Sequence, residues 1–128
     1  METGNSKSRT ILVVEDEPAT REVLRRTLEQ EGYRVCLASD GEEAVEMLRR
    51  ESTDMILLDL VLPGINGWEF CRAVRGEPAL AHIPIIIITA KDSPAYQQKA
   101  FDLGANDYIL KPFDLEEVKS RIAAVIHG

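Results

Sequence analysis

The sequence predicts a doubly wound α/β domain, in which a parallel sheet of five strands lies between two layers of helices. One observation is the strict alternation of short apolar runs with helical patterns, repeated five times along the chain. Another is that the runs at 10–14, 55–59 and 84–89 are apolar almost throughout, which is typical of strands buried on both faces. The first strand then needs neighbours on both sides, which favours the strand order 2-1-3-4-5 with right-handed crossovers.

Local signals define the first elements after the strand at 10–14. Pro18 stands at a first-turn position and begins a helix, and Gly32 is suited to end it. The stretch 33–38 alternates more, and Arg34 interrupts it, as an edge strand allows. The first βα unit is therefore followed by a strand at the border of the sheet.

Capping patterns mark the starts of three later helices, because a polar residue is followed three positions on by Glu. These pairs are Asp40 with Glu43 before a helix at 41–50, Asn66 with Glu69, and Asp114 with Glu117 before the last helix. A loop is expected at 76–83. Ser93-Pro94 should open a helix that ends near Leu103, and 107–110 should form a short last strand.

The length, charge and cysteine content of the chain exclude several classes of protein. The chain has 128 residues, which fits one domain with a single core, and we expect a disordered tail at 1–9 followed by that domain at 10–128. The net charge of −7 argues against a main role in binding nucleic acid or anionic membrane. We expect neither a membrane span nor a signal peptide. The two cysteines, Cys36 and Cys71, are expected only to fill the core, and the protein is expected to be cytoplasmic.

Chemically complementary residues follow four of the predicted strands. Glu15 and Asp16 follow the first, Asp59 ends the third, Thr89 ends the fourth and Lys111 follows the fifth. Parallel strands bring their carboxyl ends to one edge of the sheet, where ligands bind in open α/β folds. Three carboxylates crowded there would repel one another, and Mg²⁺ would relieve that repulsion. The set predicts a phosphoryl-transfer site, since a carboxylate, a hydroxyl, an ammonium and a metal serve that reaction.

Each of these residues also has an ordinary structural explanation. Glu15 and Asp16 could be first-turn acids favoured by the helix dipole, and Asp59 could cap a turn. Thr89 could simply finish a strand, and Lys111 could be a solvated lysine. If all of these explanations were correct, complementary residues would stand at four strand ends by coincidence. We therefore favour the functional interpretation.

The chain resembles a receiver domain of two-component response regulators over nearly its whole length, from about Thr10 to His127. The resemblance depends on Glu15-Asp16 after ILVV, Asp59 with Pro63-Gly64, Thr89-Ala90, the segment 104–108 and Lys111-Pro112-Phe113. It implies a flavodoxin-like three-layer sandwich and a regulatory phosphoacceptor, which catalyses its own phosphotransfer and slow dephosphorylation rather than acting as an enzyme on a substrate.

The resemblance also implies roles for individual residues. Asp59 would be the phosphoacceptor, and Asp16 and Asp59 would bind Mg²⁺ directly together with the backbone carbonyl of Val61. Glu15 would hold a metal-bound water, and Lys111 would pair with the phosphoryl group. Glu15 stands where Asp is commoner in the family, and the apolar side chain of Val61 is expected to affect the dephosphorylation rate more than metal binding.

The family also implies a switch and its partners. Thr89 would hydrogen-bond the phosphoryl group, Tyr108 would turn inward, and the Lys111-Pro112 bond would be cis. The phosphodonor would be a sensor histidine kinase or a phosphotransfer protein. The surface formed by the helix from Ser93, the strand at 107–110 and the helix from Asp114 would bind an output partner or a second copy of the chain. Trp68, shortly after Asp59, is expected near the metal site.

Three other classes of protein remain open. A flavin or nucleotide binder would share the fold, but its phosphate loop would be rich in Ser, Thr and Gly, whereas residues 15–17 are acidic. A phosphatase with an aspartyl-phosphate intermediate would resemble the site, but usually carries a second acid where Val61 stands. The third is a receiver that has lost phosphorylation. Whether the domain stands alone or belongs to a larger regulator or hybrid kinase is also open.

Overall fold

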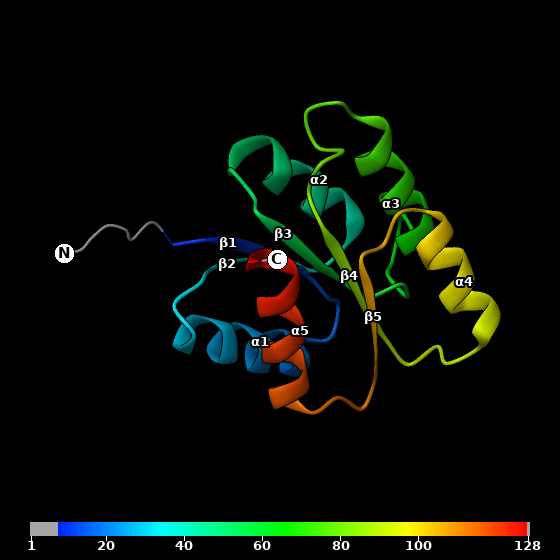
Figure 1. Cartoon of the computed structure of the whole chain (residues 1–128). Coiled ribbons are helices and arrows are strands. Elements are labelled where there is room, and N and C mark those ends of the chain that lie inside the picture. The colour runs from blue at the N-terminus through cyan, green and yellow to red at the C-terminus, as the bar shows by residue number, and fades with distance from the viewer. Residues whose placement is uncertain (1–7, 128) are drawn as a thin grey trace.

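The computed structural model describes residues 8–127 and shows one five-stranded parallel sheet in the order β2-β1-β3-β4-β5 (Figure 1). The elements are β1 (Thr10–Val14), α1 (Pro18–Gln30), β2 (Arg34–Ala38), α2 (Gly41–Arg50), β3 (Met55–Leu58), α3 (Gly67–Gly76), β4 (Ile85–Thr89), α4 (Pro94–Asp102), β5 (Asp107–Leu110) and α5 (Leu115–His127). The predicted fold class and strand order are confirmed. Most of the predicted tail lies outside the described residues.

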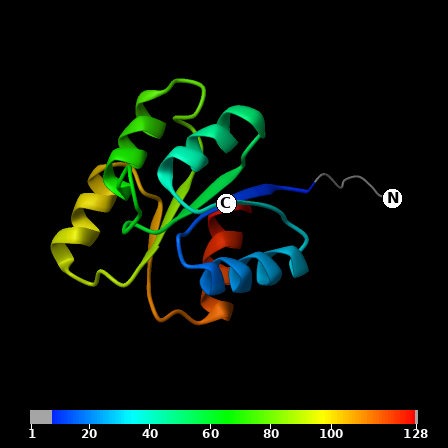
Figure 2. The ribbon, with the colours of Figure 1, turned by 180° about the vertical axis from the view of Figure 1, so that it is seen from behind.

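Helices cover both faces of the sheet, as Figures 1 and 2 show. On one face α1 and α5 pack their buried side chains, among them Leu24, Leu28 and Ile122, against alternate strand residues. On the other face α2, α3 and α4 contribute a separate cluster that includes Leu48 and Phe70. The residues of β1, β3 and β4 are all buried, which explains why their sequences are almost continuously apolar.

Strand boundaries differ from the predicted ones by a single residue. β2 begins at Arg34, β3 ends at Leu58 and β4 begins at Ile85. The backbone N–H of Asp59 still donates to the carbonyl of Val14 at 3.0 Å, so Asp59 lies directly at the end of the ladder. The expected position of Asp59 at the carboxyl edge therefore holds, although this residue is outside the strand itself.

Of the three predicted capping pairs, one is complete and two differ. At the last helix, Asp114 accepts from the N–H of Glu116 at 2.8 Å instead of that of Glu117. Asn66 and Glu69 form the reciprocal capping box, in which each side chain accepts from the backbone N–H of the other residue. Asp40 accepts from the Glu43 N–H at 2.7 Å, but the Glu43 carboxylate turns to the N–H of Ser39 instead. The second half of the predicted box at Asp40 is therefore displaced by one residue.

Candidate functional site

The carboxyl ends of the strands bring the predicted acids and lysine together. The strand register pairs Val14 with Leu58, so that the residues following β1 and β3 lie side by side. One carboxylate oxygen from each of Glu15, Asp16 and Asp59 lies within 4.8 Å of the others. This grouping joins residues more than 40 positions apart, as the predicted strand order required.

The Lys111 ammonium bridges two of the three carboxylates. Its Nζ donates to Glu15 Oε1 at 2.7 Å and to Asp59 Oδ2 at 2.8 Å. Burial alone would lower the pKa of Lys111, but the hydrogen bonds to Asp59 and Glu15 outweigh it and the pKa is raised above its usual value. Lys111 is therefore a firmly charged ammonium at the centre of the cluster.

Both oxygens of Asp59 have a hydrogen-bond donor. Oδ2 accepts from Lys111, and Oδ1 accepts from the backbone N–H of Val61 at 3.0 Å. The Asp59 side chain is buried to about nine-tenths but faces the acid cluster at the mouth of the sheet edge. These bonds hold the carboxylate in one orientation on a rigid strand end, as a nucleophile requires.

Glu15 is the most deeply buried acid of the cluster, with 1% of its side chain exposed. Burial raises the pKa of its carboxyl, while the hydrogen bonds from Lys111 and from the Glu17 N–H act in the opposite direction. Asp16, in contrast, is exposed. The cluster therefore combines one buried carboxylate, one at the rim and Asp59 between them.

The donor atoms of the cluster fit a hard divalent cation. Two oxygens on opposite sides of Mg²⁺ lie about 4.2 Å apart, given a typical Mg–O distance of 2.1 Å. At most one pair of the three carboxylate oxygens can take opposite positions, and neighbouring positions are about 3.0 Å apart. The oxygens lie within 4.8 Å of one another, so they would move closer to the ion or contact it through a bound water. Glu15, Asp16 and Asp59 are thus the residues that could hold a metal ion here.

Thr89 and Tyr108 occupy the neighbouring strands. Thr89 is fully buried at the end of β4, and its hydroxyl lies 3.5 Å from the backbone nitrogen of Lys91. The Tyr108 ring points inward, and its hydroxyl donates to the carbonyl oxygen of Lys91 at 2.5 Å. Burial raises the pKa of this phenol. Sequence reasoning missed Lys91, because a backbone acceptor leaves no signature in the side chain.

Two further expectations concern the loops of the site. The Lys111-Pro112 peptide bond is cis, as the resemblance implied. Trp68 lines a hollow of about 270 Å³ together with Val61, in the loop that follows Asp59. Its ring stacks on Tyr96 of α4, with centroids 5.8 Å apart. Trp68 is therefore close to the loop of the acid cluster, and Tyr96 is a neighbour that no local pattern pointed to.

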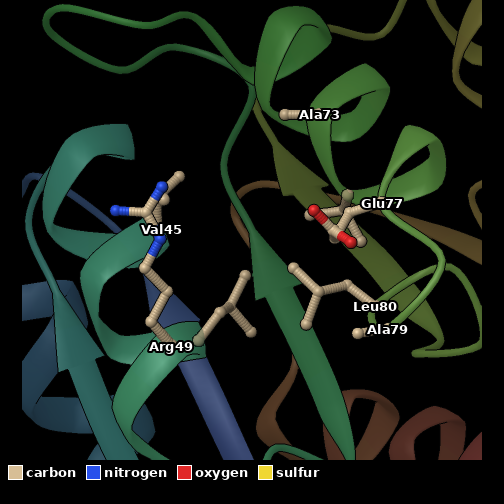
Figure 3. Close-up of a pocket in the computed structure, with 8 residues that line it drawn as sticks. Val45, Arg49, Ala73, Glu77, Ala79 and Leu80 are labelled. Atoms are coloured by element: carbon tan, nitrogen blue, oxygen red, sulfur yellow. The ribbon is translucent and has the colours of Figure 1, made fainter.

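A second hollow lies away from these residues. A groove of about 390 Å³ lies between α2 and α3. Figure 3 shows Arg49 on one wall and Glu77 on the other. It is lined by the C-terminal halves of the two helices and by the segment 77–80 after α3, and it includes none of the predicted site residues. This hollow is thus separate from the acid cluster.

Comparisons with known proteins agree with this geometry. The profile of the response regulator receiver domain matches residues 11–123. Response regulator MprA of Mycobacterium leprae is 45% identical over 116 residues, which cover 91% of this chain and 50% of MprA. The chain thus spans about half the length of the curated relatives it matches. In the described residues, no helix has the length and apolar character needed to cross a membrane.

Solved structures show the same arrangement. A putative response regulator from Chloroflexus aurantiacus superposes with a TM-score of 0.90 at 34% identity, covering 95% of this chain and 100% of that one. The receiver domain of the sensor histidine kinase PA1611 from Pseudomonas aeruginosa has a TM-score of 0.86 at 34% identity, with the same coverage of both chains. That structure holds a magnesium ion in its active site cleft.

Proposed function

Because this chain belongs to the response regulator receiver domains of two-component signalling, we propose that Asp59 is its phosphoacceptor and that the transfer depends on Mg²⁺. The observation that carries the proposal is the position of the Asp59 carboxylate, which accepts a hydrogen bond from the Lys111 ammonium and lies beside the carboxylates of Glu15 and Asp16. The phosphodonor is a phosphohistidine of a sensor kinase or a phosphotransfer protein.

The transfer moves one phosphoryl group between two nucleophiles. A carboxylate oxygen of Asp59 forms a bond to phosphorus while the bond from phosphorus to the histidine nitrogen of the donor breaks, and that nitrogen leaves with the electron pair. Mg²⁺ would be held by Asp16, Asp59 and the Val61 carbonyl, with Glu15 on a bound water, and would supply positive charge to the phosphoryl oxygens. Lys111 then releases Asp59 and pairs with a phosphoryl oxygen.

Slow hydrolysis returns the domain to its starting state. A water attacks the phosphorus of the acyl phosphate, and the Asp59 carboxylate is the leaving group. Val61, two residues after Asp59, is 54% exposed and offers no polar side-chain group that could orient such a water. We therefore assign this side chain an influence on the lifetime of the phosphorylated state.

The phosphorylated state controls a surface formed by α4, β5 and α5. Thr89 donates its hydroxyl to the phosphoryl group. Tyr108, which was expected to turn inward in this state, already lies inward with its hydroxyl on the Lys91 carbonyl, and it keeps that position. That bond joins β5 to the loop before α4, so a shift of this loop reaches both elements. An output partner, or a second copy of the chain, selects the phosphorylated arrangement through its differential contacts.

The test is phosphoryl uptake measured by intact mass. Wild-type protein with Mg²⁺ and a small phosphodonor should gain the mass of one phosphoryl group. Asp59→Asn should gain none. Asp92→Asn, a matched change in an exposed acid after β4, should behave as wild type. Undiminished uptake by Asp59→Asn, or equal uptake in the presence of a chelator, would contradict the proposal.

A further inference from the structure

Arg21 of α1 reaches back to the loop that carries the acid pair. Its Nη1 donates to the carbonyl oxygen of Glu15 at 2.9 Å and to that of Asp16 at 3.3 Å. We propose that Arg21 is a positioning residue, which holds the backbone of Glu15 and Asp16 so that Asp16 can bind the metal and Glu15 its bound water. This inference rests on the Mg²⁺ site of the proposed function.

The hydrogen bonds from Arg21 matter most for the orientation of Asp16. The Glu15 carboxylate has its own partners, since one oxygen accepts from Lys111 and the other from the Glu17 N–H. Among the described residues, the Asp16 carboxylate accepts no hydrogen bond, and its side chain is exposed. Its direction is therefore set through its main chain, and the Arg21 contact to the carbonyl of Asp16 restrains that main chain.

Local structure explains why Arg21 can act in this way. Its backbone N–H donates to the carbonyl of Glu17, so the residue is fixed in the first turn of α1. From there a long side chain with several donors can bind two successive carbonyls. A shorter side chain, or one with a single donor group, would reach the carbonyl oxygens of Glu15 and Asp16 less well.

The guanidinium binds carbonyls rather than carboxylates. Within the described residues Arg21 forms no ion pair, in contrast to Lys111, which occupies one oxygen each of Glu15 and Asp59. Arg21 therefore orients the acids without competing with a cation for them. Outer residues of this kind, which orient the ligands of a metal, typically change metal affinity on mutation.

The positive charge of Arg21 and its hydrogen bonds to the two carbonyls should affect Mg²⁺ affinity in opposite directions, so an experiment can separate them. Removing a positive charge beside three acids would, by Coulomb attraction alone, strengthen the binding of a cation. Removing the hydrogen bonds from Arg21 would weaken the binding of the cation, because Glu15 and Asp16 would lose their alignment. The direction of the change in the Mg²⁺ dissociation constant therefore separates the two effects.

The experiment is a calorimetric Mg²⁺ titration of the wild type and of two variants. Arg21→Met removes the charge and both bonds, and we expect the Mg²⁺ dissociation constant to rise roughly tenfold, at the low end for such outer residues. Arg21→Lys keeps the charge and one donor group, and should show a smaller rise. In phosphorylation assays, the Mg²⁺ concentration for half-maximal rate should rise while the rate at saturating Mg²⁺ is retained.

Arg25 supplies the matched control, because it lies one turn further along α1 and pairs with Glu22 and Glu29. Arg25→Met should leave the Mg²⁺ dissociation constant unchanged. Unfolding by urea without metal shows whether each variant is folded. If Arg21→Met destabilises the fold but binds Mg²⁺ as tightly as the wild type, or more tightly, the inference is overturned. A wild-type protein that binds no Mg²⁺ would overturn the proposed metal site itself, and the inference with it.

Discussion

At the scale of single residues, Lys111 balances the charge of the acid cluster. It is the cation that contacts both Glu15 and Asp59, and its side chain is 20% exposed. Removing one partner of such a mostly buried set leaves charges without compensation, which is far more costly than losing a surface pair. Mg²⁺ would compensate the same carboxylates, so lysine and metal have overlapping roles in stability.

We expect Lys111→Met to lower the free energy of unfolding by about 3 kcal/mol in metal-free buffer at neutral pH. Addition of Mg²⁺ should recover part of the loss, because the ion neutralises the acids that Lys111 contacted. Urea unfolding with and without Mg²⁺ measures both effects. Lys119→Met, which removes surface pairs with Glu116 and Glu31, should change stability far less than Lys111→Met does. Equal losses in the two variants would refute the role of Lys111.

The two cysteines should differ in reactivity. Cys71 is fully buried on α3, and burial raises the pKa of its thiol to about 11, whereas Cys36 is only partly buried. At pH 8 an alkylating reagent should modify Cys36 in the native protein and Cys71 only after unfolding. Intact mass shows this, with Cys36→Ser as the control that takes up no reagent while folded. Fast labelling of native Cys36→Ser would contradict the expected burial.

The same thiol has a consequence for stability at high pH. Between its ordinary pKa of 9.0 and the folded value of about 11, the unfolded chain loses the Cys71 proton first. Stability should therefore fall as the pH rises through this range, because the folded state binds more protons there. Replacement by Ala would remove this contribution, and urea unfolding of the wild type and Cys71→Ala at pH 8 and pH 10 measures it.

At the scale of elements, α3 connects the loop after Asp59 to the rest of the fold. The N–H of Gly67 donates to the carbonyl of Leu60 at 3.1 Å, and Asn66 caps the helix just before it. A Cβ atom on Gly67 would lie 2.6 Å from the Leu60 Cα, which is backbone and cannot move aside cheaply. The start of the helix therefore requires glycine because of a contact rather than a turn.

Two glycines of α3 should respond in opposite directions to the same change. Gly67→Ala should lower the free energy of unfolding by about 1–3 kcal/mol, as overpacking does. Gly76→Ala, where a Cβ meets nothing within 4 Å, should raise it by about 0.5–1 kcal/mol through the entropy of the unfolded chain. Urea unfolding of both variants decides the point, and similar effects in both would show that the Leu60 contact does not govern the helix start.

At the scale of the whole molecule, the acid cluster and the proposed output surface are linked through the sheet. The cluster lies at the ends of β1 and β3, while Thr89 and Tyr108 lie on β4 and β5. The bond from the Tyr108 hydroxyl to the Lys91 carbonyl connects β5 with the loop that leads to α4. α1 and α2 pack on β2, at the edge of the sheet opposite β5, so a change at Asp59 can reach one edge without the other.

Beryllofluoride with Mg²⁺ is a mimic of the phosphoryl group that allows the switch to be observed. We expect amide exchange to change in α4, β5 and α5, and the change to be smaller in Tyr108→Phe, which lacks the bond to Lys91. Tyr33→Phe, whose ring stacks on His127, is the matched control. Sedimentation shows whether the same treatment produces a dimer. Changes confined to residues 21–32 would place the output surface elsewhere.

The sequence by itself determined the layout of this protein. Strands buried on both faces must be apolar almost throughout, and helix starts need capping side chains, so both are visible in local pattern. The strand order then follows from connection rules, and it alone places Glu15, Asp16 and Asp59 at one edge. The predicted element bounds were wrong by one residue at several strand ends, because the end of a ladder depends on the neighbouring strand.

Only the tertiary structure decided which groups touch within that layout. Three contacts depend on side-chain rotamers and on the direction of the backbone. They are the hydrogen bonds of Lys111 to two acids, of Tyr108 to the carbonyl of Lys91, and of Arg21 to two carbonyls. Each of these contacts joins side chains to partners outside their own strand or turn, and two of the three use main-chain oxygens that every residue has. Residue type shows which groups reach the edge of the sheet, but packing of the whole chain sets how those groups are oriented there.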